Sequence, residues 1–357
     1  MLHPRPNPIV AAMYTLRDMD ADVIVVHGPA GCGFMVSRRL EDAGVRVVTT
    51  GMKESDLIFG SEEKLVRTLQ RVQERFSPRL VGVVGTCASM IIGENLDRAV
   101  ERAGMVAKVL PVDVHGCSGA NTIGAIRALE VASQRGVIPQ EEFFRQREML
   151  TQATLLESNR GLTSRDHLSP NYGTTKYAAA RRIRDALANG GKVLVALNGK
   201  KELAYGHADM LRAVQECADV VGGETGYIAN LDPEVGLPRI RRYASEIRRD
   251  LTEAGVIIDE TTGGLDEYPV AGIRAGELVQ RERWDLVVAC GIVHAIPGLD
   301  KGSILVSDQP REVDNYLRDG FTTVVSEPDI HARVMGASGI VRMELADTLR
   351  QLAGDAE

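Results

Sequence analysis

The feature that most constrains the fold of this chain is the alternation of short, continuously apolar runs with segments of helical pattern. In the first 140 residues the apolar runs are "ADVIVV", "VRVVTT", "LVGVVGT" and "AKVLPVDV", separated by amphipathic segments such as "SEEKLVRTLQRVQERF". Strands that are apolar at every position indicate a sheet that is buried on both faces. Helices between such strands indicate right-handed crossovers, so residues 1–140 are predicted to form one doubly wound α/β domain.

The same alternation returns in the second half of the chain. Residues 141–190 hold two helical segments around the polar stretch "SRDHLSPNYGTT", which predicts a helical connection. From residue 191 onward we expect strands at "KVLVALNG", "ADVVGG", "VIID", "WDLVVACG", "SILVSD" and "FTTVVSE". The predicted fold class is therefore α/β, with Rossmann-like doubly wound parallel-sheet domains at residues 1–140 and 191–357.

Charge and hydropathy exclude several classes of partner. The 357 residues carry a net charge of -7 with a sequence pI near 5.6, and the basic residues are spread along the chain. This distribution disfavours nucleic acid or a membrane surface as a partner. No segment approaches the roughly 20 apolar residues of a membrane span, and no signal-peptide pattern is present. We therefore expect a cytoplasmic protein.

The chain has five cysteines that lie far apart in the sequence: Cys32, Cys87, Cys117, Cys217 and Cys290. An odd number of cysteines without an export signal argues against a disulfide framework. No two of them are spaced as CxxC or CxxxC, which excludes a zinc ribbon or a cluster held by one local loop. Any metal site must therefore gather cysteines from distant segments.

Three of the cysteines directly follow predicted strands. Cys32 follows "VIVVHGPAG", Cys87 follows "LVGVVGT" and Cys117 follows "AKVLPVDVHG". Because the carboxyl ends of parallel strands meet at one edge of the sheet, where ligands bind, these thiols are predicted to project from the same edge. Cys217 lies in a helical pattern and Cys290 in an apolar run, so both are predicted to be small core residues.

The loop "HGPAGCGF" resembles a phosphate-binding loop in outline but lacks its chemistry. A P-loop needs a lysine and a hydroxyl residue after its last glycine, and neither is present. Cys32 instead lies at a helix start, which favours the thiolate, and glycines let the backbone approach a bulky group. These glycines are Gly28, Gly31 and Gly33. The pattern is typical of an iron–sulfur ligand, and a cysteine nucleophile with His27 or His115 as its base is the competing interpretation.

Several motifs then identify a family. The segments "HGPAGCGF", "ESDLIFGSEEKL" and "VVGTCASMIIGENLD" resemble, in order and spacing, the cluster-binding motifs of nitrogenase catalytic components and related oxidoreductases. The segments "GVRVVTTGM", "NLDPEVGLPRIRRYASEI" and "TGGLDEYPVAG" are similar to one subgroup, the reductive cyclases that act on nickel tetrapyrroles in coenzyme F-430 biosynthesis. The resemblance extends over nearly the whole chain.

The resemblance implies a nitrogenase component 1-like fold and a homodimer with a [4Fe-4S] cluster at its interface. Cys32 and Cys87 occupy the motif positions of cluster ligands, and two thiolates from each chain make the four that such a cluster usually takes. Electrons would come from a separate NifH-like iron–sulfur reductase, and ATP and Mg would act only through that partner. The implied reaction is reduction of a nickel tetrapyrrole coupled to closure of a lactam ring.

Other residues keep alternative interpretations. Cys117 is interpreted as a structural thiol, and the pair Cys290 and His294 as a chance likeness to nitrogenase cofactor ligands. A histidine pKa of about 6.5 suits proton delivery near neutral pH. The candidates for substrate contact or proton delivery are His27, His115, Arg5 and Asn7.

The acidic segment and the activity also have alternatives. Glu54, Ser55 or Asp56 would serve either to support the cluster or dock a partner, or simply to cap the helix that begins near Ser61. The alternative functions are another nitrogenase-like tetrapyrrole reductase, built from two different subunits, and a non-catalytic scaffold for metallocofactor assembly.

Overall fold

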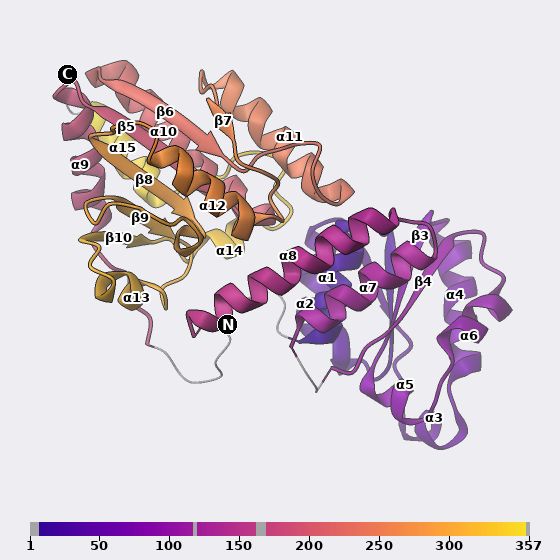
Figure 1. The fold of residues 1–357 in the computed structure, drawn as a ribbon. Helices are drawn as coiled ribbons and strands as arrows, with labels where there is room; N and C mark the ends of the chain where they lie inside the picture. The colour runs from indigo at the N-terminus through magenta and orange to yellow at the C-terminus, as the bar shows by residue number, and fades with distance from the viewer. Residues whose placement is uncertain (1–6, 117–119, 162–168, 355–357) are drawn as a thin grey trace. The chain divides into compact units, whose positions relative to one another are not determined.

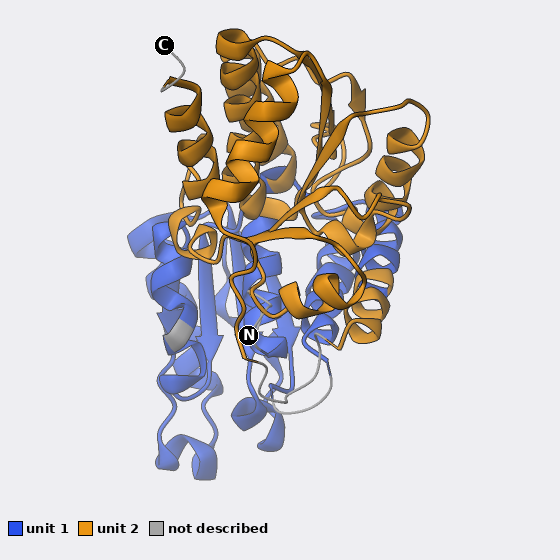
Figure 2. Cartoon of the chain, turned by 90° about the vertical axis from the view of Figure 1, so that its left-hand side faces the viewer, with its two compact units in different colours: residues 1–151, 237–239 blue, residues 152–236, 240–357 orange. Residues whose placement is uncertain are grey.

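The computed structural model describes residues 7–116, 120–161 and 169–354 of the chain. They form two compact units, coloured separately in Figure 2: residues 1–151 with 237–239, and residues 152–236 with 240–357. No described helix combines the length and the apolar composition that crossing a membrane requires. Each unit contains one parallel sheet, as the alternating sequence pattern predicts.

Unit 1 is built on a four-stranded sheet with strand order β2-β1-β3-β4. The strands are β1 (Val23–His27), β2 (Arg46–Thr49), β3 (Leu80–Gly85) and β4 (Lys108–Asp113). Neighbouring strands pair in parallel, and in the central pair His27 lies opposite Gly85. The ends of β1 and β3 are therefore adjacent at the carboxyl edge of the sheet.

Helices cover both faces of this sheet (Figure 1). On one face, α4 (Glu62–Phe76) and α6 (Leu96–Ala103) bury their apolar sides against β1, β3 and β4. On the other face lie α1 (Pro8–Asp18), α2 (Gly31–Asp42) and α7 (Thr122–Gln134). The short helices α3 (Glu54–Phe59) and α5 (Cys87–Ile91) follow β2 and β3 at the carboxyl edge, and α8 spans Gln140–Asn159. This arrangement confirms the predicted doubly wound domain.

Unit 2 contains a six-stranded parallel sheet with strand order β10-β9-β8-β5-β6-β7. Its strands are β5 (Lys192–Asn198), β6 (Glu224–Ala229), β7 (Glu260–Thr261), β8 (Leu286–Gly291), β9 (Ile304–Ser307) and β10 (Thr323–Ser326). The helices α9 (Lys176–Ala188), α10 (Ala204–Val221) and α15 (Glu344–Gly354) pack together over one face. The opposite face is covered by α12 (Tyr268–Val279) and α13 (Val313–Arg318), which share a hydrophobic core with β5, β8 and β9. The remaining elements are α11 (Pro238–Glu253), α14 (Ile330–Arg333) and the one-turn helices η1 (Lys201–Leu203) and η2 (Val293–Ala295).

Two expected strands of unit 2 are wrong. The run "ADVVGG" is the last turn of α10, which ends where Gly222 adopts a φ of 86°, and the strand begins at Glu224. The run "VIID" precedes β7, because only Glu260 and Thr261 pair with β6 at this edge. Short apolar runs fit a helix end as well as a strand, and only the pairing partner decides between them.

Candidate functional site

Two cysteines lie at the carboxyl edge of the unit 1 sheet. Cys32 is the second residue of α2, which follows β1, and Cys87 is the first residue of α5, which follows β3. Both thiols are half-buried. Since β1 and β3 are neighbouring parallel strands, their carboxyl ends bring the two cysteine loops to the same edge.

The two cysteine loops contact each other through Thr86, the residue that precedes Cys87. The hydroxyl of Thr86 donates a hydrogen bond of 3.1 Å to the carbonyl oxygen of His27, at the end of β1. A Cβ at Gly28 would lie only 2.2 Å from Oγ1 of Thr86. Glycine is therefore required here by the close approach of Thr86, and the hydrogen bond from Thr86 joins the two loops.

Cys87 accepts a hydrogen bond from the loop that follows β4. The N–H of Gly116 lies 3.1 Å from Sγ of Cys87, and Nδ1 of the exposed His115 is 3.9 Å from the same sulfur. Backbone N–H donors to sulfur stabilise thiolates and tune the potential of iron–sulfur clusters. The structure thus brings one of the two predicted histidines beside a predicted ligand.

The loop of Cys32 is open on its outer side. A Cβ built at the exposed Gly31 meets no atom within 4 Å, whereas one at the buried Gly33 would lie 3.0 Å from Cγ2 of Val26. No described group of three His, Cys, Asp or Glu side chains is placed to hold a metal ion. Two thiols with an N–H donor and an open backbone fit one half of a cluster site, which needs two more thiolates from elsewhere.

His27 is fully buried and connects three loops. Its Nδ1 lies 3.2 Å from Oγ1 of Thr50, and its Nε2 lies 3.3 Å from Oγ of Ser61 and 3.4 Å from Oε2 of Glu94. Burial lowers the pKa of His27, and the hydrogen bond with Glu94 only partly opposes this effect. The neutral imidazole therefore joins the loops that follow β1, β2 and β3. Glu94 was missed in the sequence because nothing local connects it with His27.

Large apolar side chains are exposed around this edge. Phe59 of α3 is 86% exposed, Ile91 of α5 is 78% exposed and Phe34 of α2 is 75% exposed. We call the exposed apolar residues of these three helices the apolar rim: Phe34, Leu57, Ile58, Phe59, Met90 and Ile91. Grouped apolar exposure of this kind marks an interaction surface.

The acidic segment before α4 has a local structural role. It forms its own helix, α3, rather than the cap of α4, so the expectation of a simple cap is wrong in that respect. The carboxylate of Asp56 accepts a hydrogen bond from Nζ of Lys64 at 2.7 Å, and this contact lowers its pKa. Lys64 also donates to the carbonyl oxygen of Gly51. These contacts hold α3, with its rim residues, against α4.

The other predicted residues fall elsewhere. The side chain of Asn7 caps α1 by accepting a hydrogen bond from the N–H of Val10 at 2.9 Å. Cys217 and Cys290 are fully buried in α10 and β8, as expected, and burial raises the pKa of Cys217 to about 11. Arg5 and Cys117 lie outside the described residues.

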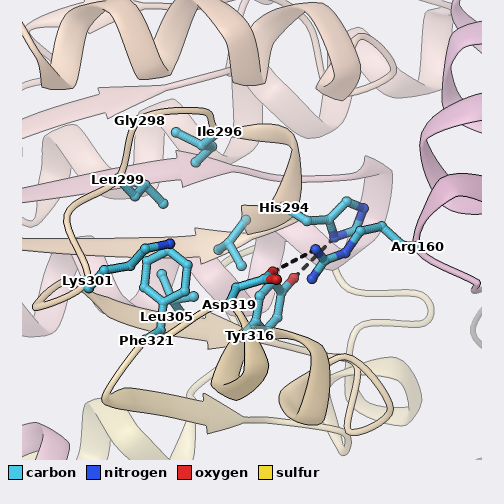
Figure 3. A pocket seen from close by; sticks show the side chains of 11 residues that line it. Arg160, His294, Ile296, Gly298, Leu299, Lys301, Leu305, Tyr316, Asp319 and Phe321 are labelled. Carbon is cyan, nitrogen blue, oxygen red and sulfur yellow. Dashed lines mark hydrogen bonds and ion pairs between the residues drawn. The ribbon is translucent and has the colours of Figure 1, made fainter.

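Unit 2 contains a cavity of about 300 Å³ beside the loop between β8 and β9 (Figure 3). Its polar wall is formed by Arg160, His294, Tyr316 and Asp319. Nη1 of Arg160 binds Asp319 at 2.8 Å, and Nδ1 of His294 lies 3.1 Å from the hydroxyl of Tyr316. The volume is at the small end of the range of about 300–1,000 Å³ for ligand pockets. Lys301 also lines the cavity, and the volume limits it to a small ligand.

Comparison with known proteins then decides the family. Residues 8–142 match the nitrogenase component 1 type oxidoreductases. Component CfbD of the Ni-sirohydrochlorin a,c-diamide reductive cyclase complex of Methanothermobacter thermautotrophicus is 48% identical over 98% of this chain and 98% of its own length. The corresponding component of Methanosarcina acetivorans is 43% identical over 100% of this chain and 98% of its own. The chain belongs to the CfbD family.

Family membership confirms the resemblance predicted from the motifs. Component CfbD of Methanocaldococcus jannaschii is a further relative, 40% identical over 98% of each chain. Among solved structures, nitrogenase Cp1 at pH 6.5 aligns with 98% of this chain and 92% of its own, at 13% identity and a TM-score of 0.32. That score is too low to bear on function.

Proposed function

We propose that this chain is the catalytic component of a nitrogenase-like reductive cyclase. It would reduce Ni-sirohydrochlorin a,c-diamide and close its lactam ring, in the biosynthesis of coenzyme F-430. A NifH-like (CfbC-like) iron–sulfur reductase would supply the electrons, with ATP and Mg used only by that partner. The proposal is supported by the names of the CfbD relatives and, above all, by the two interlocked cysteine loops at the carboxyl edge of unit 1.

Cys32 and Cys87 would hold one half of a [4Fe-4S] cluster. When bound, such a cluster transfers single electrons. The chain itself contributes the geometry, since the hydrogen bond from Thr86 to His27 keeps the two loops together. The N–H of Gly116 would stabilise the thiolate of Cys87. His27 is buried and would position the loops, whereas the exposed His115 is available for proton transfer or substrate contact.

A second copy of the chain would complete the site. Two thiolates per chain make four when the cysteine edges of two chains meet on a twofold axis. The apolar rim lies on the three helices that follow β1, β2 and β3 and is exposed in the single chain. Covering such a surface with an identical surface would remove it from water and exclude solvent from the cluster.

The test is to measure iron, sulfide and the reduced-state EPR signal of anaerobically purified protein, together with its mass in solution. We expect about four irons per dimer in wild type and loss of the cluster in Cys32→Ala and in Cys87→Ala. Cys217→Ala is the matched control, because Cys217 is buried in α10 of unit 2 and should not affect iron content. A full cluster in either edge variant would remove that cysteine from the ligand set.

Turnover separates the enzyme from the alternatives. Wild type with the reductase, ATP and Ni-sirohydrochlorin a,c-diamide should give a reduced, lactam-containing product. A reducible cluster without any product would instead favour a scaffold for metallocofactor assembly. A requirement for a second, different catalytic subunit would favour a reductase of the two-subunit type.

A further inference from the structure

The carboxyl edge of the unit 2 sheet carries an ionised pair that the proposed function does not use. Asp308 directly follows β9, and His331 lies on α14, which follows the neighbouring strand β10. The two strands are parallel, and Ser307 pairs with Ser326 at their ends. Ligands of doubly wound sheets bind at this edge, where loops leave the strands.

The carboxylate of Asp308 contacts one ring nitrogen of His331 and so orients the imidazole. Nε2 of His331 lies 2.7 Å from Oδ2 of Asp308, whose side chain is completely buried. The side chain of His331 is 34% exposed, and its Nδ1 makes no hydrogen bond with the described residues. One ring nitrogen is therefore fixed by a buried carboxylate, while the ring remains open to solvent.

The carboxylate of Asp308 lies closer to His331 than to its other histidine neighbour, His207. His207 of α10 also faces Asp308, with Nε2 at 3.9 Å from Oδ1. Burial lowers the pKa of His207, and its Nδ1 lies 3.1 Å from the carbonyl oxygen of Leu203. His207 is thus neutral and its ring is bound on the far side to the backbone. It cannot share a proton with solvent.

Nearby carboxylates favour the protonated form of His331. Burial is the largest single effect and lowers the pKa of His331, but its ion-pair contact with Asp308 and the attraction of nearby carboxylate charge together outweigh burial, so the net pKa is raised above its usual value. Glu202 raises this pKa further, and Lys200 lowers it. Lys200 follows β5, so a lysine cation and the imidazole of His331 both lie at this edge, where they suit a substrate with several carboxylates.

We propose that His331 is a catalytic proton donor for reduction of the macrocycle, and that Asp308 is its positioning residue. This inference rests on the proposed function, in which the iron–sulfur reductase supplies the electrons. After each electron arrives, the Nδ1–H bond of His331 breaks and a C–H bond forms on a macrocycle carbon. The neutral imidazole then takes up a proton from water. Two electrons and two such protons saturate one double bond of the ring.

A purely structural ion pair makes different predictions. If the pair only fastened α14 to β9, removing the imidazole would lower stability and added imidazole would not restore activity. A proton donor that is one-third exposed leaves a gap that a small acid in solution can enter. Rescue by imidazole and the pH dependence of turnover therefore separate the two roles.

The experiment compares His331→Gln, His331→Ala and Asp308→Asn with the control Arg333→Gln, which changes an exposed residue of the same short helix. Cluster content and its reduction by the partner should match wild type in all variants. We expect kcat to fall by about 10²–10⁴-fold in His331→Gln, as for loss of a general acid, and imidazole to restore part of it in His331→Ala. Arg333→Gln should turn over at the wild-type rate.

The pH dependence provides a readout that does not require the substrate. A titration of the His331 ring by NMR should give a pKa above 6.5 in wild type and a lower one in Asp308→Asn. In turnover, kcat should decline as pH rises through the pKa of His331, and Asp308→Asn should move that decline to lower pH.

The proposal is overturned by wild-type kcat in His331→Gln, by the absence of imidazole rescue, or by an unchanged pKa in Asp308→Asn. A wild type that holds a reducible cluster yet makes no product would overturn the proposed function, and the proton-donor role with it. Product from wild type together with full activity in His331→Gln would overturn only the proton-donor role.

Discussion

The hydroxyl of Thr86 donates a hydrogen bond of 3.1 Å to the carbonyl oxygen of His27 and so joins the two loops that carry the predicted cluster ligands. Thr86 immediately precedes Cys87, and His27 ends the strand that leads to Cys32. Neither contact partner is a ligand. The spacing of the two thiols is therefore set by backbone and hydroxyl contacts beside them.

Gly28→Ala should displace these loops. The new Cβ would lie 2.2 Å from Oγ1 and 2.7 Å from Cγ2 of Thr86, and such overpacking costs about 1–3 kcal/mol of stability. We expect iron content to fall, as measured on anaerobic protein, together with the midpoint of urea unfolding. Gly31→Ala is the control, since its Cβ meets no atom within 4 Å. Iron content and an unfolding midpoint in Gly28→Ala equal to those of Gly31→Ala would contradict the clash.

Glu94→Gln should loosen the connection between the loops. The carboxylate of Glu94 accepts the N–H of Ser61 at 2.6 Å and lies 3.4 Å from Nε2 of the buried His27. Replacing a charged acceptor by an amide should lower the free energy of unfolding by about 1–3 kcal/mol. Activity should fall in proportion to cluster content, measured by iron analysis and turnover on the same samples. A large loss of turnover per bound cluster would show instead that Glu94 takes part in proton transfer.

Phe59→Ser should weaken dimerisation. Phe59 is 86% exposed at the apolar rim, so the change removes apolar area that a second copy would bury. We expect the dimer dissociation constant to rise about tenfold or more, since each 1.4 kcal/mol of lost interaction is tenfold. The measurement is sedimentation at several concentrations.

Val106→Ser is the matched control for the rim. Val106 is 90% exposed but lies just before β4, at the amino edge of the unit 1 sheet. Neither change should alter the unfolding free energy of the monomer by more than about 0.5 kcal/mol. If Phe59→Ser leaves the dimer intact but slows reduction by the partner, the rim binds the reductase rather than a second copy.

Acid should destabilise the chain partly through His294. Burial lowers the pKa of His294 to about 4 in the folded chain, whereas the unfolded chain binds its proton near pH 6.5. Protons therefore bind preferentially to the unfolded state, and stability is lost as pH falls from about 7 toward 4. Between pH 8 and pH 5 this single group should cost about 2 kcal/mol.

Urea unfolding of wild type and His294→Gln at these two pH values checks the prediction. The variant should show a smaller loss, because its side chain does not titrate. His27 and His207 also have lowered pKa values, but they are present in both proteins and so contribute equally. The same pH dependence in both would exclude His294 as a source of acid sensitivity.

Long periodic segments made most of the fold predictable. The apolar run at residues 80–86 and the amphipathic pattern of α4 can be recognised without knowing which element packs beside them. A continuous apolar run and a period of 3.6 residues are properties of the local sequence. The helix end at 218–221 and the two-residue strand β7 could not be recognised in this way. Their structure depends on which strand lies alongside, and pairing is not a local property.

Sequence alone determined the two parallel-sheet units, the edge from which Cys32 and Cys87 project, and the family. Each follows from local apolar patterns or from motif spacing along the chain. Four contacts appear only in the folded chain: Thr86 donates to the carbonyl oxygen of His27, Glu94 lies beside His27, Gly116 donates to Cys87, and Asp308 contacts His331. These contacts join residues from different loops, and their distances are set by how strands and helices pack rather than by any spacing in the chain.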